Sequence, residues 1–499
     1  TNGVPTLTNV DAVLNLPNLT TLNISNTGVT GELDVSNLQA LSGITGFGTK
    51  ITGITFGEKN TNVSSVRMGG LTSLSSLSGL EYLTNQSGVT LKLQNTSVRS
   101  LNIPSGTNGS HAKFTEIDCS NNGALENIVI GENVTVGILN LTDAAALTSI
   151  SFPTAPMNMT TLNLTGTTAL TNLENLKSQL NTLTSLTLDG TKLESSSSIP
   201  ELNFSNNSSL TTLSLTNFPN TTVTLPTNGG NIRSLTLNNV KTDSLDLSAM
   251  NNLETLSLLN LSGTDLTLPS SNTGITTLTL DNLEFDSIDL SGMTGLITIN
   301  LRNMPKGFHV DFGSNTTTTT LDLTGSDLSE YENDQIKGDL DALTTLTLNN
   351  TNISSFDSSS ISGLSKLKKI HLNNNAALEK VVFNAGDNKL EEIYIASCAN
   401  PTDIRIEDNQ VLRYIDLSGT KITTAGLHLA EEYEKLSGLD LQNTGLDGTF
   451  KIPGFKSTNS TWSGTISQQV YMPNTDVEVI DVSNAGTLRM LVASNCKNL

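Results

Sequence analysis

A short apolar–polar–apolar unit recurs at nearly constant spacing along this chain, and the recurrence limits the fold more than any other feature. Its clearest stretch contains Leu235, Leu256, Leu278, Ile299 and Leu321, which are separated by 21, 22, 21 and 22 residues. Repeats of this length are typical of solenoids, in which each unit packs only against its neighbours. We therefore expect a stack of coils and not a globule.

The same series extends in both directions over most of the 499 residues. Within each unit, the alternation of apolar and polar residues indicates a strand with its apolar side chains on one face. The further members of the series are Leu22, Ile44, Val66, Leu91, Ile117, Leu139, Leu162, Leu186, Leu213, Leu346, Ile370, Ile393, Ile415, Leu439 and Ile480. The sequence predicts a β-rich solenoid of about twenty coils of 21–24 residues, with a main parallel sheet.

A second apolar series lies about half a coil after the first and predicts a second wall of shorter strands. Its members in the clearest stretch are Leu245, Leu266, Ile288 and Val310. Helices should be few, because only residues 329–340 and 425–436 have a helical pattern.

We treat residues 1–499 as a single solenoid domain. The wide spacing between Leu439 and Ile480 indicates an insertion at about 456–476, which contains Trp462. Because the last repeat unit is incomplete, we expect the natural chain to continue beyond residue 499.

Several units match a known consensus. The segments that begin at Leu343, Leu412 and Leu436 read LTTLTLNNTNI, LRYIDLSGTKI and LSGLDLQNTGL, and they resemble the leucine-rich repeat LxxLxLxxNxL. The segments that begin at Phe114 and Val477 resemble the two-strand repeats of internalin-like bacterial surface or secreted proteins. The resemblance implies the leucine-rich-repeat fold. It implies no single function, because the family includes adhesins, receptors and inhibitors.

The asparagine position of the consensus carries different residues in this chain. They are Thr27, Thr167, Thr191, Thr351, Thr420, Thr444, Asn122, Asn375 and Cys398. Cys496 occupies the same position in the last unit, and Cys119 an inward position of its strand. We therefore predict that all three cysteines are buried, reduced and unpaired.

Composition and motifs argue against several classes of function. The chain has 26 Lys and Arg against 47 Asp and Glu, a net charge of −21, and nucleic acid is bound by clustered cations. No apolar run is long enough for membrane insertion. The four histidines lack metal-ligand spacing, and nucleophile and phosphate-binding motifs are absent. We therefore expect no cofactor, no metal and no enzymatic activity.

Outward positions of the main strands carry mostly threonine, serine and asparagine, but four consecutive units differ. They carry Lys369, His371, Glu392, Tyr394, Tyr414, Asp416 and Asp440. Neighbouring coils place such side chains about 5 Å apart, so we expect one charged and aromatic patch, with Trp462 at its edge. Such a patch is typical of ligand recognition, and the alternative is a set of surface charges without a partner.

We expect a secreted or cell-surface scaffold that mediates adhesion or recognition of a protein or glycan through its main sheet. An acidic chain rich in threonine, serine and asparagine is typical of exported bacterial proteins. The alternative is a structural rod or filament subunit, in which the terminal coils self-associate end to end.

Overall fold

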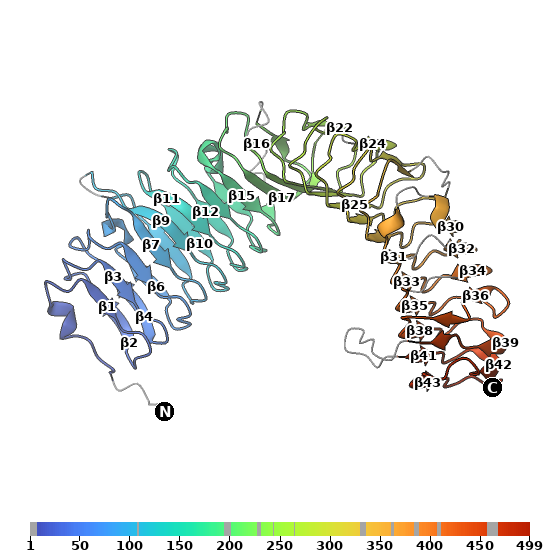
Figure 1. Ribbon diagram of the computed structural model, residues 1–499. Coiled ribbons are helices and arrows are strands. Elements are labelled where there is room, and N and C mark those ends of the chain that lie inside the picture. Colours follow the sequence, from blue (N-terminus) through green and yellow to red (C-terminus); the bar gives the residue numbers. More distant parts are fainter. Residues whose placement is uncertain are drawn as a thin grey trace. The chain divides into compact units, whose positions relative to one another are not determined.

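The computed structural model describes residues 7–106, 109–193, 201–226, 231–242, 244–263, 265–329, 336–360, 364–383, 389–406, 411–456 and 468–499. The chain divides into two compact units, Thr1–Met250 and Asn251–Leu499. In both units, strands of a main parallel sheet alternate along the chain with strands of an opposite wall (Figure 1). The predicted parallel β-solenoid with few helices is therefore confirmed.

The main sheet of the first unit pairs each strand with that of the next coil. Its strands are β1 (Thr21–Asn23), β3 (Gly43–Thr45), β5 (Ser65–Arg67), β7 (Val89–Lys92), β9 (Lys113–Asp118), β11 (Thr135–Asn140), β13 (Thr161–Asn163), β15 (Ser185–Leu188), β17 (Thr212–Phe218) and β19 (Ser234–Val240). The opposite wall contains β2 (Thr30–Asp34), β4 (Lys50–Thr55), β6 (Ser76–Ser78), β8 (Ser100–Ile103), β10 (Asn127–Ile130), β12 (Ser149–Ser151), β14 (Asn172–Glu174), β16 (Glu201–Asn203), β18 (Thr222–Thr224) and β20 (Ser244–Asp246).

The second unit repeats this arrangement. Its main sheet contains β21 (Thr255–Leu259), β23 (Thr277–Asp281), β25 (Thr298–Arg302), β27 (Thr320–Asp322), β29 (Thr345–Thr347), β31 (Lys369–His371), β33 (Glu392–Tyr394), β35 (Tyr414–Asp416), β38 (Gly438–Asp440), β41 (Gln469–Tyr471) and β43 (Met490–Val492). The opposite wall contains β22 (Asp265–Thr267), β24 (Ser287–Asp289), β26 (His309–Asp311), β28 (Ile336–Lys337), β30 (Ser355–Asp357), β32 (Lys380–Phe383), β34 (Asp403–Ile406), β36 (Leu427–Leu429), β39 (Asp447–Lys451) and β42 (Asp476–Asp481), and β37 (Glu432–Tyr433) pairs with β40 (Gly454–Phe455).

Helical structure in the described residues is confined to short 3₁₀ turns. They are Val13–Asn15, Leu80–Tyr82, Leu176–Thr182, Ser358–Ser360 and Leu364–Lys366. The helix predicted at 425–436 is wrong, because β36 and β37 lie there. The helix predicted at 329–340 is also wrong where the structure describes it, since Ile336 and Lys337 form β28. Apolar residues three and four apart imitate a helical period when one coil turns quickly between two short strands.

The core lies between the two walls and is built from the predicted apolar series. Leu278 of β23 lies in register between Leu256 and Ile299, and all three side chains are fully buried. Their neighbours Ser257 and Thr279 point to the other face of the sheet and are partly exposed. The alternation that the sequence predicts therefore divides the core from the outer face in this sheet.

A left-handed backbone residue ends the turn after every main strand, four positions beyond its central apolar residue. Asn260 and Asn282 hold this position after Leu256 and Leu278, with φ angles of 54° and 54°. Other coils place glycine there, as at Gly325 with φ 76°. Glycine and asparagine tolerate this conformation better than other residues. The requirement accounts for many of the asparagines in the chain.

Buried polar residues close many of the turns at the asparagine position of the consensus, whereas other coils have a buried apolar residue there, such as Phe218, Leu261 and Met304. The hydroxyl of Thr420 donates to the carbonyl of Leu417 at 2.8 Å. Asn375 donates to the carbonyls of Leu372 in its own coil and Leu348 in the preceding coil, both at 2.8 Å. These bonds satisfy carbonyl groups that the turn would otherwise leave unpaired in the interior.

The predicted register fails near the end of the chain. Leu439 pairs with Val470 of β41 and not with Ile480, which lies in β42 opposite Phe450 on the other wall. The turn rule given above supports Val470, because Asn474, four positions later, has a φ angle of 60°. The pattern around Ile480 has the same alternation as a main strand, so alternation alone could not separate the two walls. Of the insertion predicted at about 456–476, residues 457–467 lie outside the described part of the chain.

The three cysteines are free, but their burial differs. Cys119 and Cys398 are buried as predicted, whereas Cys496 is only half-buried, so that prediction is wrong for Cys496. Its thiol donates to the carbonyl of Met472 at 3.3 Å. Cys496 lies in the coil of β43, which has a neighbouring main strand on one side, β41.

The prediction of a single domain over 1–499 stays a prediction. Within the described ranges, none of the helical segments is both long and apolar enough to cross a bilayer.

Candidate functional site

The predicted patch residues occupy two adjacent columns on the outer face of the main sheet in the second unit. Glu392 lies in register between Lys369 and Tyr414 in one column. The other column contains His371, Tyr394, Asp416, Asp440 and Tyr471 in consecutive strands. The sheet therefore brings together the seven residues predicted on these strands, from Lys369 to Asp440. We call these residues together with Tyr471 the Tyr394 patch.

The aromatic part of the patch is held by polar contacts at its edge. The rings of His371 and Tyr394 are stacked, with centroids 4.4 Å apart and an interplanar angle of 8°. The hydroxyl of Tyr394 donates to Oε2 of Glu392 at 2.8 Å, and the same carboxylate lies 2.7 Å from Nζ of Lys369. The Tyr394 ring is thus fixed on its face and at its hydroxyl.

Tyr414 extends this aromatic surface across the next strand. Its ring centroid is 5.6 Å from that of Tyr394, with the planes tilted by 50°. Gly438, its partner in register on β38, leaves the space that the ring occupies. A Cβ at position 438 would lie only 2.7 Å from Cδ2 of Tyr414. The missing side chain of Gly438 therefore lets the ring lie close to the sheet.

Two carboxylates lie side by side next to these rings. Asp416 and Asp440 are partners in register on β35 and β38. The amide of Ser418 donates to Asp416 at 2.9 Å, and the backbone and side-chain amides of Gln442 donate to Asp440, both at 3.1 Å. The backbone fixes both groups in place, and their charges reinforce each other toward solvent.

The pKa directions follow from this environment. Burial, followed by the charge of Lys369, lowers the pKa of His371 below 6.5, so its ring is neutral at pH 7. Burial also raises the pKa of Asp440 above 3.8, and Asp416 adds to the increase. Burial first, then neighbouring carboxylates, raises the pKa values of Tyr394 and Tyr414, so both phenols remain protonated.

Two members of the surface were missed by the sequence analysis. Gly438 has no functional group and was therefore not a candidate, yet its missing side chain makes room for the Tyr414 ring. Tyr471 was assigned to the insertion, whereas it lies on β41 beside Asp440 and is 37% exposed. Reading Val470 as the central residue of a main strand would have found it. The predicted edge residue Trp462 lies outside the described residues.

The outer face of the main sheet also carries a charged cluster in the first unit. Lys92 of β7 forms ion pairs with Glu116 and, at 3.3 Å, with Asp118, both on β9. Arg67 of β5 lies in register beside Lys92. In this cluster opposite charges pair with each other, whereas the Tyr394 patch combines stacked rings with two adjacent carboxylates. In the part of the chain that the structure describes, no three His, Cys, Asp or Glu side chains gather as a metal site.

The coil described above, with its x-L-x-L strand and its buried Asn or Thr, is that of a leucine-rich repeat. Residues 316–376 match the family model described as "Leucine rich repeat". The same coil recurs in both units, and the chain has the leucine-rich-repeat fold. Scaffolds of this fold are commonly used for protein recognition.

Several solved structures show similarity over much of the chain. The functional domain of InlJ from Listeria monocytogenes has 18% identity, covering 62% of this chain and 75% of that chain with a TM-score of 0.35. YopM from Yersinia enterocolitica WA-314 has 15% identity, covering 95% and 91% with a TM-score of 0.46. The plant peptide hormone receptor RGFR1 has 14% identity, covering 96% and 82% with a TM-score of 0.41. Comparison with curated protein sequences gave no match.

Proposed function

We propose that this protein is a non-enzymatic recognition scaffold that binds a partner protein through the Tyr394 patch. The observation that carries the proposal is the fixed row of rings formed by His371, Tyr394 and Tyr414. Because these rings are already ordered, a partner that covers them gains apolar burial at little cost in side-chain entropy. Aromatic residues on a rigid surface are the usual centre of protein interfaces.

Charge indicates which side chain of the partner would lie beside the rings. The carboxylates of Asp416 and Asp440 form one edge of the patch, between Tyr414 and Tyr471 in neighbouring strands. An arginine can pair with carboxylates and stack on a tyrosine ring in one pose. We therefore expect the partner to present an arginine, or a lysine, at this edge.

The location that goes with this proposal is the cell surface or the extracellular space. Its support is compositional: the chain has a net charge of −21 and is rich in threonine, serine and asparagine. Adhesion is one form that such recognition would take there.

The test compares two double variants on protein and glycan arrays. Tyr394→Ala with Tyr414→Ala removes the rings, and Thr255→Ala with Ser257→Ala changes the outer face of β21 in the same sheet as a control. We expect protein ligands of the unmodified chain to lose about 2 kcal/mol, roughly thirtyfold in Kd, in the first variant only.

Equal binding by both variants would remove the patch from the proposal. Ligands found only on the glycan array would change the partner class to carbohydrate. Open-ended fibres of the purified chain, formed equally by both variants, would support the structural subunit that the sequence analysis left as its alternative.

A further inference from the structure

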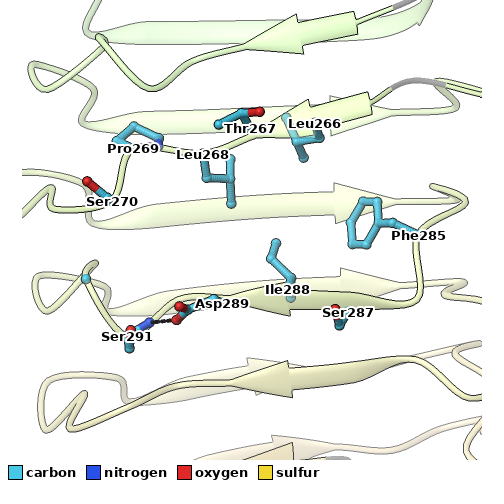
Figure 2. A pocket seen from close by; sticks show the side chains of 11 residues that line it. Leu266, Thr267, Leu268, Pro269, Ser270, Phe285, Ser287, Ile288, Asp289 and Ser291 are labelled. Carbon is cyan, nitrogen blue, oxygen red and sulfur yellow. Dashed lines mark hydrogen bonds between the residues drawn. The ribbon is translucent and has the colours of Figure 1, made fainter.

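The opposite wall of the second unit has an opening between two successive strands, β22 and β24. Beyond it, β24 pairs in register with β26, and β26 with β28. Among the described residues, no ladder joins β22 to β24. A pocket of about 330 Å³ lies between them, lined on its apolar side by Leu266, Leu268, Pro269, Phe285 and Ile288. Figure 2 shows Leu268 and Ile288 pointing toward each other from the two coils.

The β22 coil lacks the turn that follows the next two strands of this wall. After β24, the amide of Ser291 donates to Oδ1 of Asp289 at 2.8 Å, and the next coil repeats this turn with Asp311 as acceptor. The β22 coil has Thr267 at the acceptor position and Pro269 at the donor position. Proline has no amide hydrogen, so this turn cannot form there.

The facing strand edges have unused backbone groups. On its other side, β24 uses the carbonyl of Asp286, which accepts from His309 at 2.8 Å, and the amide of Leu290, which donates to Asp311 at 2.7 Å. Successive residues of a strand direct these groups to opposite sides. The backbone groups of Ser287 and Asp289 therefore face β22, and within the described chain no backbone bond to β22 engages them.

The side chains confirm that the opening reaches solvent. Leu266 and Leu268 of the β22 coil are half-buried, whereas their counterparts Ile288 and Leu290 one coil later are buried. Apolar side chains at these positions are exposed because the neighbouring strand does not close over them.

Contacts on two sides hold the opening in place. The main strands of the same two coils, β21 and β23, remain paired in register. At the end of the pocket, the amide of Asn272 donates to the carbonyl of Gly292 at 3.1 Å. A Cβ at Gly292 would lie only 1.8 Å from the carbonyl oxygen of Ser270, which shows how closely the coils approach there. Among the described strands of this wall, ladders are also missing between β28 and β30 and between β36 and β39, so the opening beside β22 is distinguished by its apolar lining and acidic surroundings and not by the break alone.

The charge around the opening has one sign. From Thr242 to Leu301 the sequence contains no lysine, arginine or histidine. Asp265, Glu284, Asp286 and Asp289 are exposed on the strands and turns around the pocket. A positively charged occupant would therefore be favoured.

We propose that the opening between β22 and β24 binds an extended, positively charged segment of a partner protein as an added β-strand. The backbone of such a segment can bond to both facing strand edges. An apolar side chain on one face would contact Leu268, Ile288 and Phe285, and a lysine or arginine on the other face would approach Asp289. A compact small molecule would leave most of the strand-edge groups unpaired.

The test uses the full chain and a labelled, end-capped peptide of alternating valine and lysine. Binding is measured by fluorescence anisotropy, and hydrogen exchange of the amides of Ser287 and Asp289 is followed with and without the peptide. We expect binding with slower exchange of these amides, and a loss of affinity of about tenfold or more when alternate peptide nitrogens are methylated.

A paired substitution of the protein tests the opening itself. Thr267→Asp with Pro269→Ser restores the turn of the neighbouring coils, so β22 should pair with β24. We expect this variant to fold with equal or higher stability. Its affinity for the peptide should fall by about tenfold or more. The Tyr394→Ala and Tyr414→Ala variant should bind the peptide unchanged, which separates this site from the Tyr394 patch.

Three results would overturn the proposal. They are absence of peptide binding, equal binding of the methylated peptide, and equal binding of a peptide in which glutamate replaces lysine. Undiminished peptide binding by a folded variant with the restored turn would also exclude this opening as the site.

Discussion

The imidazole ring of His371 lies flat on the phenol ring of Tyr394, with centroids 4.4 Å apart and planes 8° from parallel. One face of each ring is thus removed from water before any partner arrives. The neutral form of the imidazole is the one that tolerates this contact, because a buried cation would lose hydration.

We expect His371 to titrate below 6.5, because burial and then Lys369 lower its pKa. The neutral His371 ring contributes fully to folding stability above the pKa that His371 has in the unfolded chain. This contribution is lost as the pH falls through the pKa of His371 in the folded chain. NMR of the imidazole protons would measure the titration. Tyr394→Ala should raise the pKa toward 6.5 by admitting water, and Thr255→Ala should leave it unchanged. A midpoint at or above 6.5 in the unmodified chain would contradict the prediction.

Asp440→Asn should stabilise the protein at neutral pH. Burial and Asp416 raise the pKa of Asp440 above 3.8, so its contribution to stability is lost as the pH rises through the folded pKa. We expect the free energy of unfolding at pH 7 to increase by less than about 1 kcal/mol, and the difference to vanish well below pH 3.8. Urea unfolding at several pH values measures it.

Asp246→Asn is a control in which we expect the opposite change in the free energy of unfolding. Hydrogen bonds from Ser248 lower the pKa of Asp246, so removal of its charge should destabilise the chain at pH 7. If both variants shift stability in the same direction, burial and Asp416 do not disfavour the charge of Asp440 as proposed.

The left-handed turn position predicts a difference between two small substitutions. Asn282 has a φ angle of 54°, and its Nδ2 donates to Oδ1 of Asn260 at 2.8 Å. Asn282→Ala should cost about 1–2 kcal/mol of unfolding free energy for the backbone conformation alone. Asn282→Gly avoids that strain and should cost less. Equal losses in urea unfolding would show that the side-chain hydrogen bond, and not the backbone, determines this position.

The cysteines should react with thiol reagents in a fixed order. Burial, followed by Asp118, raises the pKa of Cys119 to about 12, and burial raises that of Cys398 to about 11. Cys496 is only half-buried. Because the thiolate is the reactive form, we expect native protein to be alkylated first at Cys496. Mass spectrometry of timed samples would detect the order, and early labelling of Cys119 would be inconsistent with it.

The sequence predicts the coil well because one periodicity determines both strand and burial. Leu278 and Thr279 could be assigned to opposite faces from alternation alone, and the structure confirms both. Val470 could not be separated from Ile480 in this way, because strands on both walls alternate. The left-handed conformation of Asn474, four positions after Val470, distinguishes the two residues, and the sequence alone does not reveal this conformation.

The sequence predicted which residues lie next to one another at the site. It did not predict the distances and angles between their side chains. Register alone placed Glu392 beside Lys369 and Tyr414. The stacking of His371 on Tyr394, and the room that Gly438 leaves, depend on rotamers that spacing does not determine. The opening beside β22 was not predicted, because the break in the ladder between β22 and β24 depends on backbone positions that the apolar pattern does not determine.

The left-handed residue four positions after the central apolar residue of each main strand has a consequence for how such a chain can change by descent. Each coil contains its own left-handed residue, so a coil that is duplicated or deleted whole takes this requirement of its turn with it. The coils on either side then meet equivalent neighbours. An outward side chain such as that of Tyr394 is not part of this turn. Gene duplication can therefore lengthen the scaffold while point substitutions alter its recognition surface, and neither process constrains the other.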